Sequence, residues 1–315
     1  MQADSAAEPV SRRPARRSPP TERVIALLDF LTSGRGERFG LSELARELGI
    51  SKPTCLGIVT ELTECGYLVR DPKTLTYGLG PALIAAGRVA QNGFAMAGVA
   101  QTHLERLSAT YGTTCTASAV VNERIMVLAN TGPDTTAKVG QTYPFAPPVG
   151  LMYVLWGPDA ALDAWLAKEP TLPVRLDADY LRQVVDECRA RGYLVERLTV
   201  AGSRLHSVMA GVAAYDLPAE VRELVGELVS SLGERVYLGT DITPRSKHQV
   251  NLIAAPTFDA DGRQDMVLTL HAGTAITGAE IARRGAALRA AAKAVTAAAG
   301  APSATSWRAR PNGSR

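Results

Sequence analysis

The segment Ile50–Leu62, "ISKPTCLGIVTEL", has the apolar spacing of a helix but lacks the paired Glu and Lys residues of an ordinary solvent-exposed helix face. Four apolar residues at helical intervals predict its inward face: Cys55, Ile58, Val59 and Leu62. The opposite face carries Lys52, Thr54, Gly57 and Thr60. These residues are small or hydrogen-bonding, which raises the question of what they contact.

The residues before this helix predict a second helix and a tight turn. "LSELARELG" has apolar residues at helical spacing, with Ser42 as the predicted N-cap and Gly49 as the stop. After the turn, Ser51 caps the next helix, and Pro53 lies in its first turn, where a missing N–H costs nothing. Gly66 ends that helix.

An earlier helix and a later hairpin complete a first folded unit, predicted to span residues 21–80. "TERVIALLDFLT" has helical spacing, with Thr21 as the predicted N-cap. "YLVRDPKTLTYGLG" alternates on either side of a turn at residues 71–74. Helix, helix, tight turn, helix and hairpin is the order of a winged helix-turn-helix, whose recognition helix enters the major groove of DNA.

The residues predicted to contact DNA lie on the third helix and beside it. A small, hydrogen-bonding face can lie against base edges and phosphates, and a helix N-terminus favours a phosphate. The predicted set is Ser51, Lys52, Pro53, Thr54, Leu56, Gly57, Thr60, Arg46 and Arg70. The alternative is a small three-helix domain with an ordinary solvent face.

Four stretches between Arg23 and Gly87 together resemble the winged helix-turn-helix of IclR-type transcriptional regulators: "RVIALLDFLTSG", "LSELARELGISKPT", "LTECGYLVRD" and "YGLGPALIAAG". Members of that family usually carry an Arg or a comparable side chain in the middle of the recognition helix, where this chain has Leu56 and Gly57. A mid-helix Gly costs about 1 kcal/mol relative to Ala. Gly57 either permits close approach to the DNA backbone or reduces the number of base contacts.

The rest of the chain predicts a linker helix at residues 81–92 and a second folded unit at residues 93–300. "CTASAVVN" and "RIMVLAN" have the pattern of strands, whereas "GLMYVLW", "DAALDAWLA" and "DADYLRQVVDECRARG" are typical of helices. "SVMAGVAAYDLP" predicts a strand, "PAEVRELVGELVSSLG" a helix, and "NLIAAPTFDADGRQDMVLTL" a hairpin. This order predicts an α+β unit with a mostly antiparallel sheet. The resemblance implies a GAF-like antiparallel sheet flanked by helices.

By resemblance, the second unit binds a small-molecule effector. The implied site residues are Pro147, Pro148, Gly150, Leu151, Leu252, Thr269 and His271. The family typically has a Lys in the loop-to-helix turn, where this chain has Leu151. Thr269 and His271 share one face of the strand "VLTLH", although a structural role for His271 is an equal alternative. A mostly apolar set of this kind predicts an apolar or aromatic effector rather than a small dicarboxylate.

Charge and composition limit the partners that can be expected. The net charge is +3, from 34 basic and 31 acidic residues, so a DNA partner has to be argued from a local surface. Residues 1–20 predict a disordered basic arm, either solvated or in non-specific contact with DNA, and residues 301–315 a disordered tail. The four cysteines lack the spacing of a zinc site or disulfide framework, which suits a reducing cytoplasm. No secretory signal or membrane-spanning run is expected, so no membrane partner is predicted.

These patterns and the resemblance together predict a cytoplasmic, ligand-responsive transcriptional regulator. Its expected partners are double-stranded operator DNA, a small-molecule effector and further copies of itself, as a homodimer or homotetramer. The sequence has no G-x-S-x-G, H-E-x-x-H or P-loop motif, so no catalytic residue, metal or cofactor is predicted. One alternative is an enzyme with a GAF-like catalytic domain fused to a DNA-binding head. Another is a scaffold whose winged helix binds protein.

Overall fold

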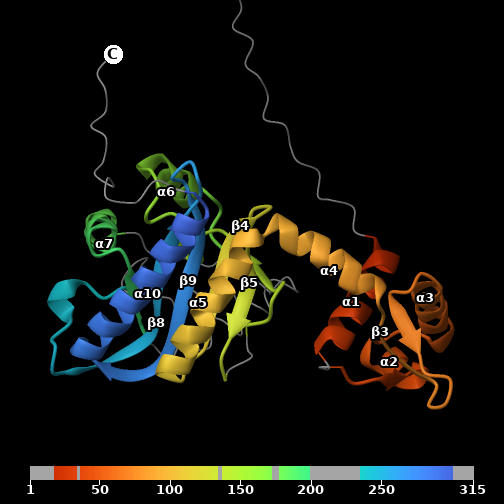
Figure 1. The fold of residues 1–315 in the computed structure, drawn as a ribbon. Helices are drawn as coiled ribbons and strands as arrows, with labels where there is room; N and C mark the ends of the chain where they lie inside the picture. The colour runs from red at the N-terminus through yellow and green to blue at the C-terminus, as the bar shows by residue number, and fades with distance from the viewer. Residues whose placement is uncertain (1–17, 34–35, 134–136, 172–176, 199–234, 301–315) are drawn as a thin grey trace, which may run out of the picture. The chain divides into compact units, whose positions relative to one another are not determined.

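The computed structural model describes residues 18–33, 36–133, 137–171, 177–198 and 235–300 (Figure 1). The chain divides into two compact units, Met1–Gly93 and Phe94–Arg315. Four predicted segments lie outside the described residues: most of the basic arm, the strand "SVMAGVAAYDLP", the helix "PAEVRELVGELVSSLG" and the tail at 301–315.

The first unit contains the helices and hairpin of a winged helix-turn-helix. Its helices are α1 (Pro19–Ser33), α2 (Leu41–Glu47), α3 (Lys52–Glu64) and α4 (Ala82–Gly93). Its strands are β1 (Phe39–Gly40), β2 (Leu68–Arg70) and β3 (Thr76–Leu79), in an antiparallel sheet of order β1-β3-β2. The predicted order of elements is confirmed.

A small apolar core holds this unit together. Helices α1, α2 and α3 and the hairpin each contribute two buried side chains, which are Leu27, Leu31, Leu44, Ala45, Cys55, Val59, Leu68 and Tyr77. The predicted inward face of α3 is confirmed, since Ile58 and Leu62 pack half-buried against the same core. The core therefore fixes α3 by one face and leaves its opposite face to solvent.

The start of α3 is set by a side-chain cap. Ser51 has extended backbone angles, and its hydroxyl oxygen accepts a hydrogen bond from the backbone N–H of Thr54 at 3.3 Å. Pro53 lies in the first turn, as predicted. Gly49, in the preceding turn, has a φ of 62°, a conformation that favours glycine.

Two other predicted caps are wrong. Helix α1 begins at Pro19, so Thr21 lies inside the helix, because proline is compatible with a first helical turn and lets the helix extend backwards. Helix α2 has Gly40 at its N-cap, and Ser42 lies within its first turn. The strand β1 runs directly into α2, which places the cap one residue earlier than the serine pattern indicated.

The wing, which is the hairpin of β2 and β3, is stabilised by hydrogen bonds in its turn and by the close approach of Gly80 to the backbone of Gly66. A carboxylate oxygen of Asp71 accepts hydrogen bonds from the N–H groups of Lys73 at 2.8 Å and Thr74 at 3.1 Å. These two bonds hold the pKa of Asp71 below its usual value. A Cβ on Gly80 would lie 2.3 Å from the carbonyl oxygen of Gly66, so only glycine fits where the hairpin passes the end of α3.

The second unit is one sheet with helices around it. Its helices are α5 (Ala95–Tyr111), α6 (Asp159–Leu166), α7 (Ala178–Arg191) and α10 (Gly278–Ala298), with short 3₁₀ turns η1 (Leu151–Tyr153) and η2 (Gly239–Asp241). Its strands are β4 (Cys115–Val121), β5 (Arg124–Thr131), β6 (Thr142–Pro144), β7 (Leu194–Arg197), β8 (Lys247–Phe258) and β9 (Gln264–Thr277).

The strands form an antiparallel sheet of order β6-β5-β4-β9-β8-β7. Helices α5 and α10 cover one face of it (Figure 1) and pack on buried residues such as Leu268 and Leu270. The turn η1 and helices α6 and α7 contribute to a second cluster with residues from the opposite face, such as Leu252 and Val267. The predicted fold class, a winged helix-turn-helix followed by an antiparallel sheet flanked by helices, is confirmed.

The prediction of a helix at "GLMYVLW" is wrong. Only Leu151–Tyr153 forms a helical turn, and the chain then continues irregularly to α6. Val154, Leu155 and Trp156 are all buried in the second apolar cluster. A short run that is almost entirely apolar has no periodicity to separate a helix from other structures.

The cap of α3 leads to a first prediction. Ser51→Ala should lower the free energy of unfolding of the first unit by about 1 kcal/mol, because the N–H of Thr54 loses its acceptor. Ser42→Ala is the matched control, since Ser42 provides no cap, and should change stability by less than about 0.5 kcal/mol. Urea unfolding curves of the three proteins measure the difference. Equal midpoints for Ser51→Ala and wild type would contradict the capping role.

Candidate functional sites

The residues predicted to contact DNA lie mostly on the free face of α3. Five of them on this helix are exposed: Lys52, Pro53, Leu56, Gly57 and Thr60. Arg46 lies on α2 and forms an exposed ion pair with Glu47 at 3.0 Å. Arg70 ends β2, and its guanidinium carbon lies 5.9 Å from the ring centroid of Tyr77. The structure thus gathers most of the set on one helix, with Arg46 and Arg70 on neighbouring elements.

Ser51 and Thr54 have their hydroxyl groups directed to each other. The two oxygen atoms lie 2.8 Å apart, and the Ser51 oxygen also accepts the N–H of Thr54. The Thr54 side chain is therefore part of the cap as well as part of the predicted contact surface.

The wing adds basic residues that the sequence analysis did not single out. Lys73 is exposed in the turn between β2 and β3. Arg38 donates a hydrogen bond to the backbone carbonyl of Val69 at 2.9 Å, so it lies across the hairpin. Lys73 was recognisable from its place in the predicted turn, whereas the position of Arg38 required the strand pairing.

Three residues of the predicted effector site share one face of the sheet. Leu252 of β8 is paired in register with His271 of β9, and Thr269 lies two residues earlier on the same face. His271 Nε2 lies 3.2 Å from the hydroxyl oxygen of Thr116 on β4. Leu252 and Thr269 are 2% and 4% exposed, so both are buried in this structure.

The other four predicted effector-site residues lie in the loop before η1. Pro147 and Pro148 are joined by a cis peptide bond, and the carbonyl of Pro147 accepts a hydrogen bond from the N–H of Thr171 at 2.8 Å. Gly150 has a φ of 111°, and a Cβ there would lie 2.8 Å from the ring of Phe145. Leu151 packs in the same apolar cluster as Leu252. The loop and this face of the sheet therefore meet in one apolar cluster, to which Leu151 and Leu252 both belong.

A separate hollow of about 420 Å³ lies at the end of this cluster. Its lining comes from β4 and the turn after it, the segment from Phe145 to Lys168, and the start of β9. The lining residues are Val120, Glu123, Phe145, Tyr153, Val154, Ala161, Ala164, Trp165, Lys168, Gln264 and Asp265. None of the seven predicted effector-site residues is among them. Sequence reasoning missed this site because its residues are far apart along the chain.

The hollow combines aromatic rings with a few polar groups. The hydroxyl of Tyr153 lies 2.6 Å from that of Ser118, and burial raises the pKa of the phenol. Lys168 Nζ lies 4.1 Å from the ring centroid of Phe145 and forms an ion pair with Glu123. Burial, with the negative charge of Asp259 nearby, raises the pKa of Asp265.

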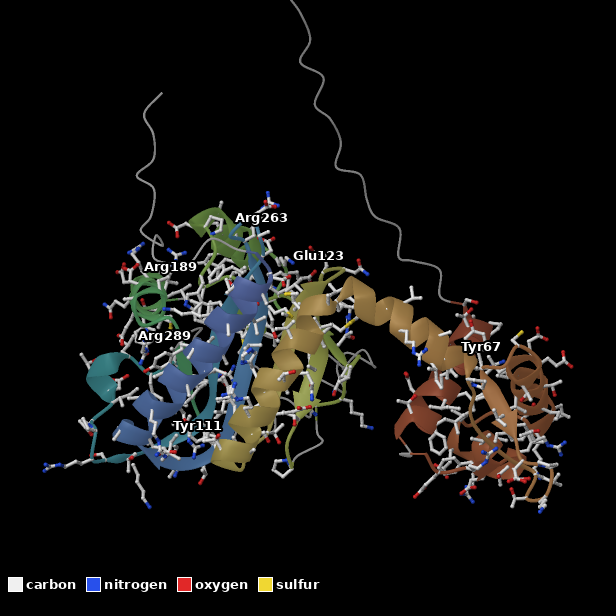
Figure 2. The ribbon with its side chains drawn as sticks, viewed as in Figure 1. Tyr67, Tyr111, Glu123, Arg189, Arg263 and Arg289 are labelled. Atoms are coloured by element: carbon white, nitrogen blue, oxygen red, sulfur yellow. The ribbon has the colours of Figure 1, made fainter. Side chains whose placement is uncertain are left out.

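One arginine positions the chain that leads from η1 to α6. Arg189 lies on α7 (Figure 2). It donates hydrogen bonds to the carbonyls of Leu155 at 2.8 Å and Gly157 at 2.7 Å, and it pairs with Asp159 at 2.8 Å. This single side chain thus ties α7 to the segment that carries Tyr153 and Trp165.

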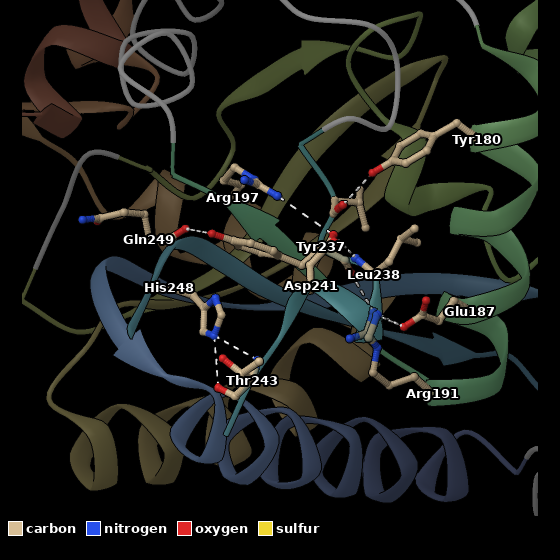
Figure 3. A network of polar contacts seen from close by, with 12 residues as sticks. Tyr180, Glu187, Arg191, Arg197, Tyr237, Leu238, Asp241, Thr243, His248 and Gln249 are labelled. Carbon is tan, nitrogen blue, oxygen red and sulfur yellow. Dashed lines mark hydrogen bonds and ion pairs between the residues drawn. The ribbon is translucent and has the colours of Figure 1, made fainter. Parts of the chain in front are cut away.

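A polar network holds residues 236–243 against the sheet (Figure 3). The guanidinium carbon of Arg197 lies 4.3 Å from the ring centroid of Tyr237, and His248 meets the same ring edge-on at 5.7 Å. The Tyr237 hydroxyl donates to the carbonyl of Gln249 at 3.1 Å, and Arg191 donates to the carbonyl of Tyr237 at 2.9 Å. These groups are engaged with one another, which makes the network structural.

The described residues hold neither a metal-binding cluster nor a membrane-spanning helix. No group of three or more His, Cys, Asp and Glu side chains in these ranges is arranged to hold a metal ion. None of the helices there combines the length and apolar character that a bilayer-spanning segment needs.

Comparison with known families identifies the first unit. Residues 20–72 match the IclR helix-turn-helix domain. This segment is an IclR-type helix-turn-helix domain. The match covers α1 to α3 and the start of the wing, and the predicted resemblance to the IclR family of transcriptional regulators is confirmed.

Two proteins with similar sequences are regulatory proteins. The glycerol operon regulatory protein of Streptomyces griseus is 39% identical over 66 residues, which cover 21% of this chain and 26% of that protein. The glycerol operon regulatory protein of Streptomyces coelicolor is 25% identical over 182 residues, covering 56% of this chain and 71% of that protein. The matched region is thus about a quarter of the first relative, and neither relative supports the enzyme alternative.

Solved structures share the IclR fold along most of the chain. IclR of Thermotoga maritima has a TM-score of 0.59 at 16% identity and covers 89% of this chain and 98% of that one. An IclR homolog from Microbacterium hydrocarbonoxydans, complexed with 4-hydroxybenzoate, has a TM-score of 0.52 at 16% identity, covering 89% and 98%. At this identity the likeness concerns the fold.

The contacts of Arg189 lead to a second prediction. Arg189→Ala should lower the free energy of unfolding of the second unit by about 2–3 kcal/mol, because two carbonyl groups lose a charged donor. Arg182→Ala on the same helix is the matched control. Its ion pair with Asp179 is exposed, so its loss should cost less than about 1 kcal/mol. Thermal unfolding of both variants provides the measurement, and equal losses of stability would argue against the positioning role.

Proposed function

We propose that this protein is a transcriptional regulator that binds operator DNA through residues 20–72 and a small molecule through its second unit. The observation that carries the proposal is the free face of α3 in an IclR-type helix-turn-helix domain. Regulatory relatives and the shared fold support it. A DNA-binding role also supports the predicted cytoplasmic location.

In the proposed complex with DNA, different parts of the first unit contact different parts of the duplex. Lys52 and the N–H groups at the start of α3 face a phosphate, and the exposed side chains that follow face base edges. Arg46, Arg70 and Lys73 lie on elements beside α3 and supply further phosphate contacts. Such contacts position the domain, whereas contacts to base edges select the sequence.

The single recognition helix found among the described residues supports a homodimer or homotetramer on a pseudo-palindromic site. Two such helices related by a two-fold axis read half-sites whose centres are about 10 base pairs apart, or a multiple of that. The effector then acts by linkage. It can shift DNA affinity only through its different affinities for two arrangements of the DNA-binding units, which the segment at residues 81–92 connects to the second unit.

An apolar or aromatic effector is favoured by the surfaces of the second unit. The face that carries Leu252, Thr269 and His271 combines apolar side chains with a few polar ones, Thr116 among them, and the neighbouring hollow is lined by Phe145, Tyr153 and Trp165. The Microbacterium homolog binds an aromatic acid, 4-hydroxybenzoate. The Streptomyces relatives regulate a glycerol operon, so glycerol is the second compound to test.

The third prediction concerns DNA binding. Lys52→Ala should weaken binding to all sequences and reduce the slope of log affinity against log salt by about one, because one phosphate contact is lost. Lys247→Ala in the second unit is the control and should leave the slope unchanged. Footprints and salt titrations on a selected operator provide both measurements. A single isolated half-site would contradict the two-fold arrangement, and an unchanged slope for Lys52→Ala would contradict the phosphate contact.

The fourth prediction separates the two candidate ligand sites. Thr269→Ala and His271→Ala should each shift the concentration of 4-hydroxybenzoate that changes DNA binding by about 3- to 10-fold, because each removes one hydrogen-bonding group. Affinity for DNA without ligand should stay unchanged. Lys168→Ala is the comparison in the hollow. A shift for Lys168→Ala alone would place the effector there, and a response to glycerol but not to 4-hydroxybenzoate would contradict the aromatic class.

A further inference from the structure

The exposed side of the first turns of the recognition helix offers few side chains that read bases by hydrogen bonds, chiefly Lys52 and Thr60. Residues 51–66 contain no Arg, Asn, Gln or His. Leu56, Gly57 and Thr60 lie three, four and seven residues after Pro53, and all four are exposed, so they form one stripe of the helix. Leu56 projects from the middle of this stripe with 46% of its surface exposed.

The polar groups near this stripe have other tasks. The hydroxyl of Thr54 is engaged with Ser51 in the helix cap. Lys52 is the first residue of α3, where a phosphate is the favoured partner. Glu61 and Glu64 are exposed further along the helix, where their charges disfavour the DNA backbone. The first two turns of α3 therefore present mainly apolar atoms to a base pair.

Gly57 leaves open space beside Leu56. A Cβ at Gly57 would have no atom within 4 Å, and its backbone is helical, so neither packing nor conformation requires glycine here. Glycine in a helix interior is nevertheless unfavourable relative to alanine. Its effect on the surface is to remove a side chain next to Leu56, so that another molecule can approach the helix closely there.

We propose that Leu56 selects a thymine in the operator by contact with its C5 methyl group. In the major groove, the thymine methyl is the one apolar feature among the base edges, and an apolar side chain is its usual partner. Leu56 is in the N-terminal half of the recognition helix, which is the half that meets base edges in helix-turn-helix proteins. Gly57 provides the room for that approach. This inference rests on the DNA-binding function proposed above.

The test uses deoxyuridine, which lacks the C5 methyl group and keeps every hydrogen-bonding group of thymine. An operator is first selected from random duplexes with the full-length protein, and each symmetric pair of thymines is then replaced in turn. Replacement at one of these pairs should weaken binding about fourfold for each half-site, as expected for the loss of one buried methyl group. With both half-sites replaced, the two losses multiply to about fifteenfold. All other pairs should have smaller effects.

The residue is assigned by a double-mutant cycle. For Leu56→Ala, thymine and deoxyuridine at that position should bind equally well, since the partner of the methyl group is absent. Ile25→Ala is the matched control, because Ile25 is also an exposed apolar residue of the first unit, 52% exposed, and should keep the full ratio. The wild-type ratio needs no variant, so it tests whether a thymine methyl group is read at all even if Leu56→Ala does not fold.

Three results would overturn the inference. If a selected operator binds wild type equally with thymine and with deoxyuridine at every position, no methyl group is read, although the regulator function stands. If the ratio is the same for wild type and Leu56→Ala, another residue reads the methyl. If no duplex is selected at all and no salt-dependent affinity is found, both this inference and the proposed function fail.

Discussion

The second unit depends on the alternation of side chains along one central strand. Strand β9 pairs with β4 on one side and β8 on the other, so its residues point in turn to the two faces of the sheet. Leu268 and Leu270 anchor the helices α5 and α10, while Thr269 and His271 lie on the opposite face. A shift of the pairing register of β9 by one residue would turn Leu268 and Leu270 away from the helices and Thr269 and His271 towards them. The burial of the two leucines therefore also fixes the face on which Thr269 and His271 lie.

In the first unit, the helix α3 likewise has two sides with different roles. Cys55 and Val59 commit one side of α3 to the core, and the cap at Ser51 fixes where the helix begins. The exposed side of α3 contributes little to the stability of the unit, so its residues can be determined by the molecule that it binds. An exposed leucine beside a glycine that nothing requires is compatible with stability, because the buried side supplies the packing.

Local patterns predicted the elements well and their ends less well. The inward face of α3 and the cap at Ser51 follow from spacing and local hydrogen bonding, which a few neighbouring residues decide. Thr21 and Ser42 were predicted as caps on the same grounds and are not, because Pro19 extends α1 backwards and β1 leads directly into α2. For "GLMYVLW", an almost entirely apolar composition removed the periodicity on which a helix prediction depends.

The sequence by itself determined the winged helix-turn-helix, since each signal there lies within one helix or turn, and it indicated the exposed residues of α3. Only the tertiary structure brought Tyr153, Trp165 and Gln264 around one hollow, because these residues are widely separated in the chain. Strand register, likewise, placed His271 beside Thr116 and opposite Leu252. Helical spacing is a property of neighbours, whereas a binding site is built by pairing between distant strands, which no local pattern encodes.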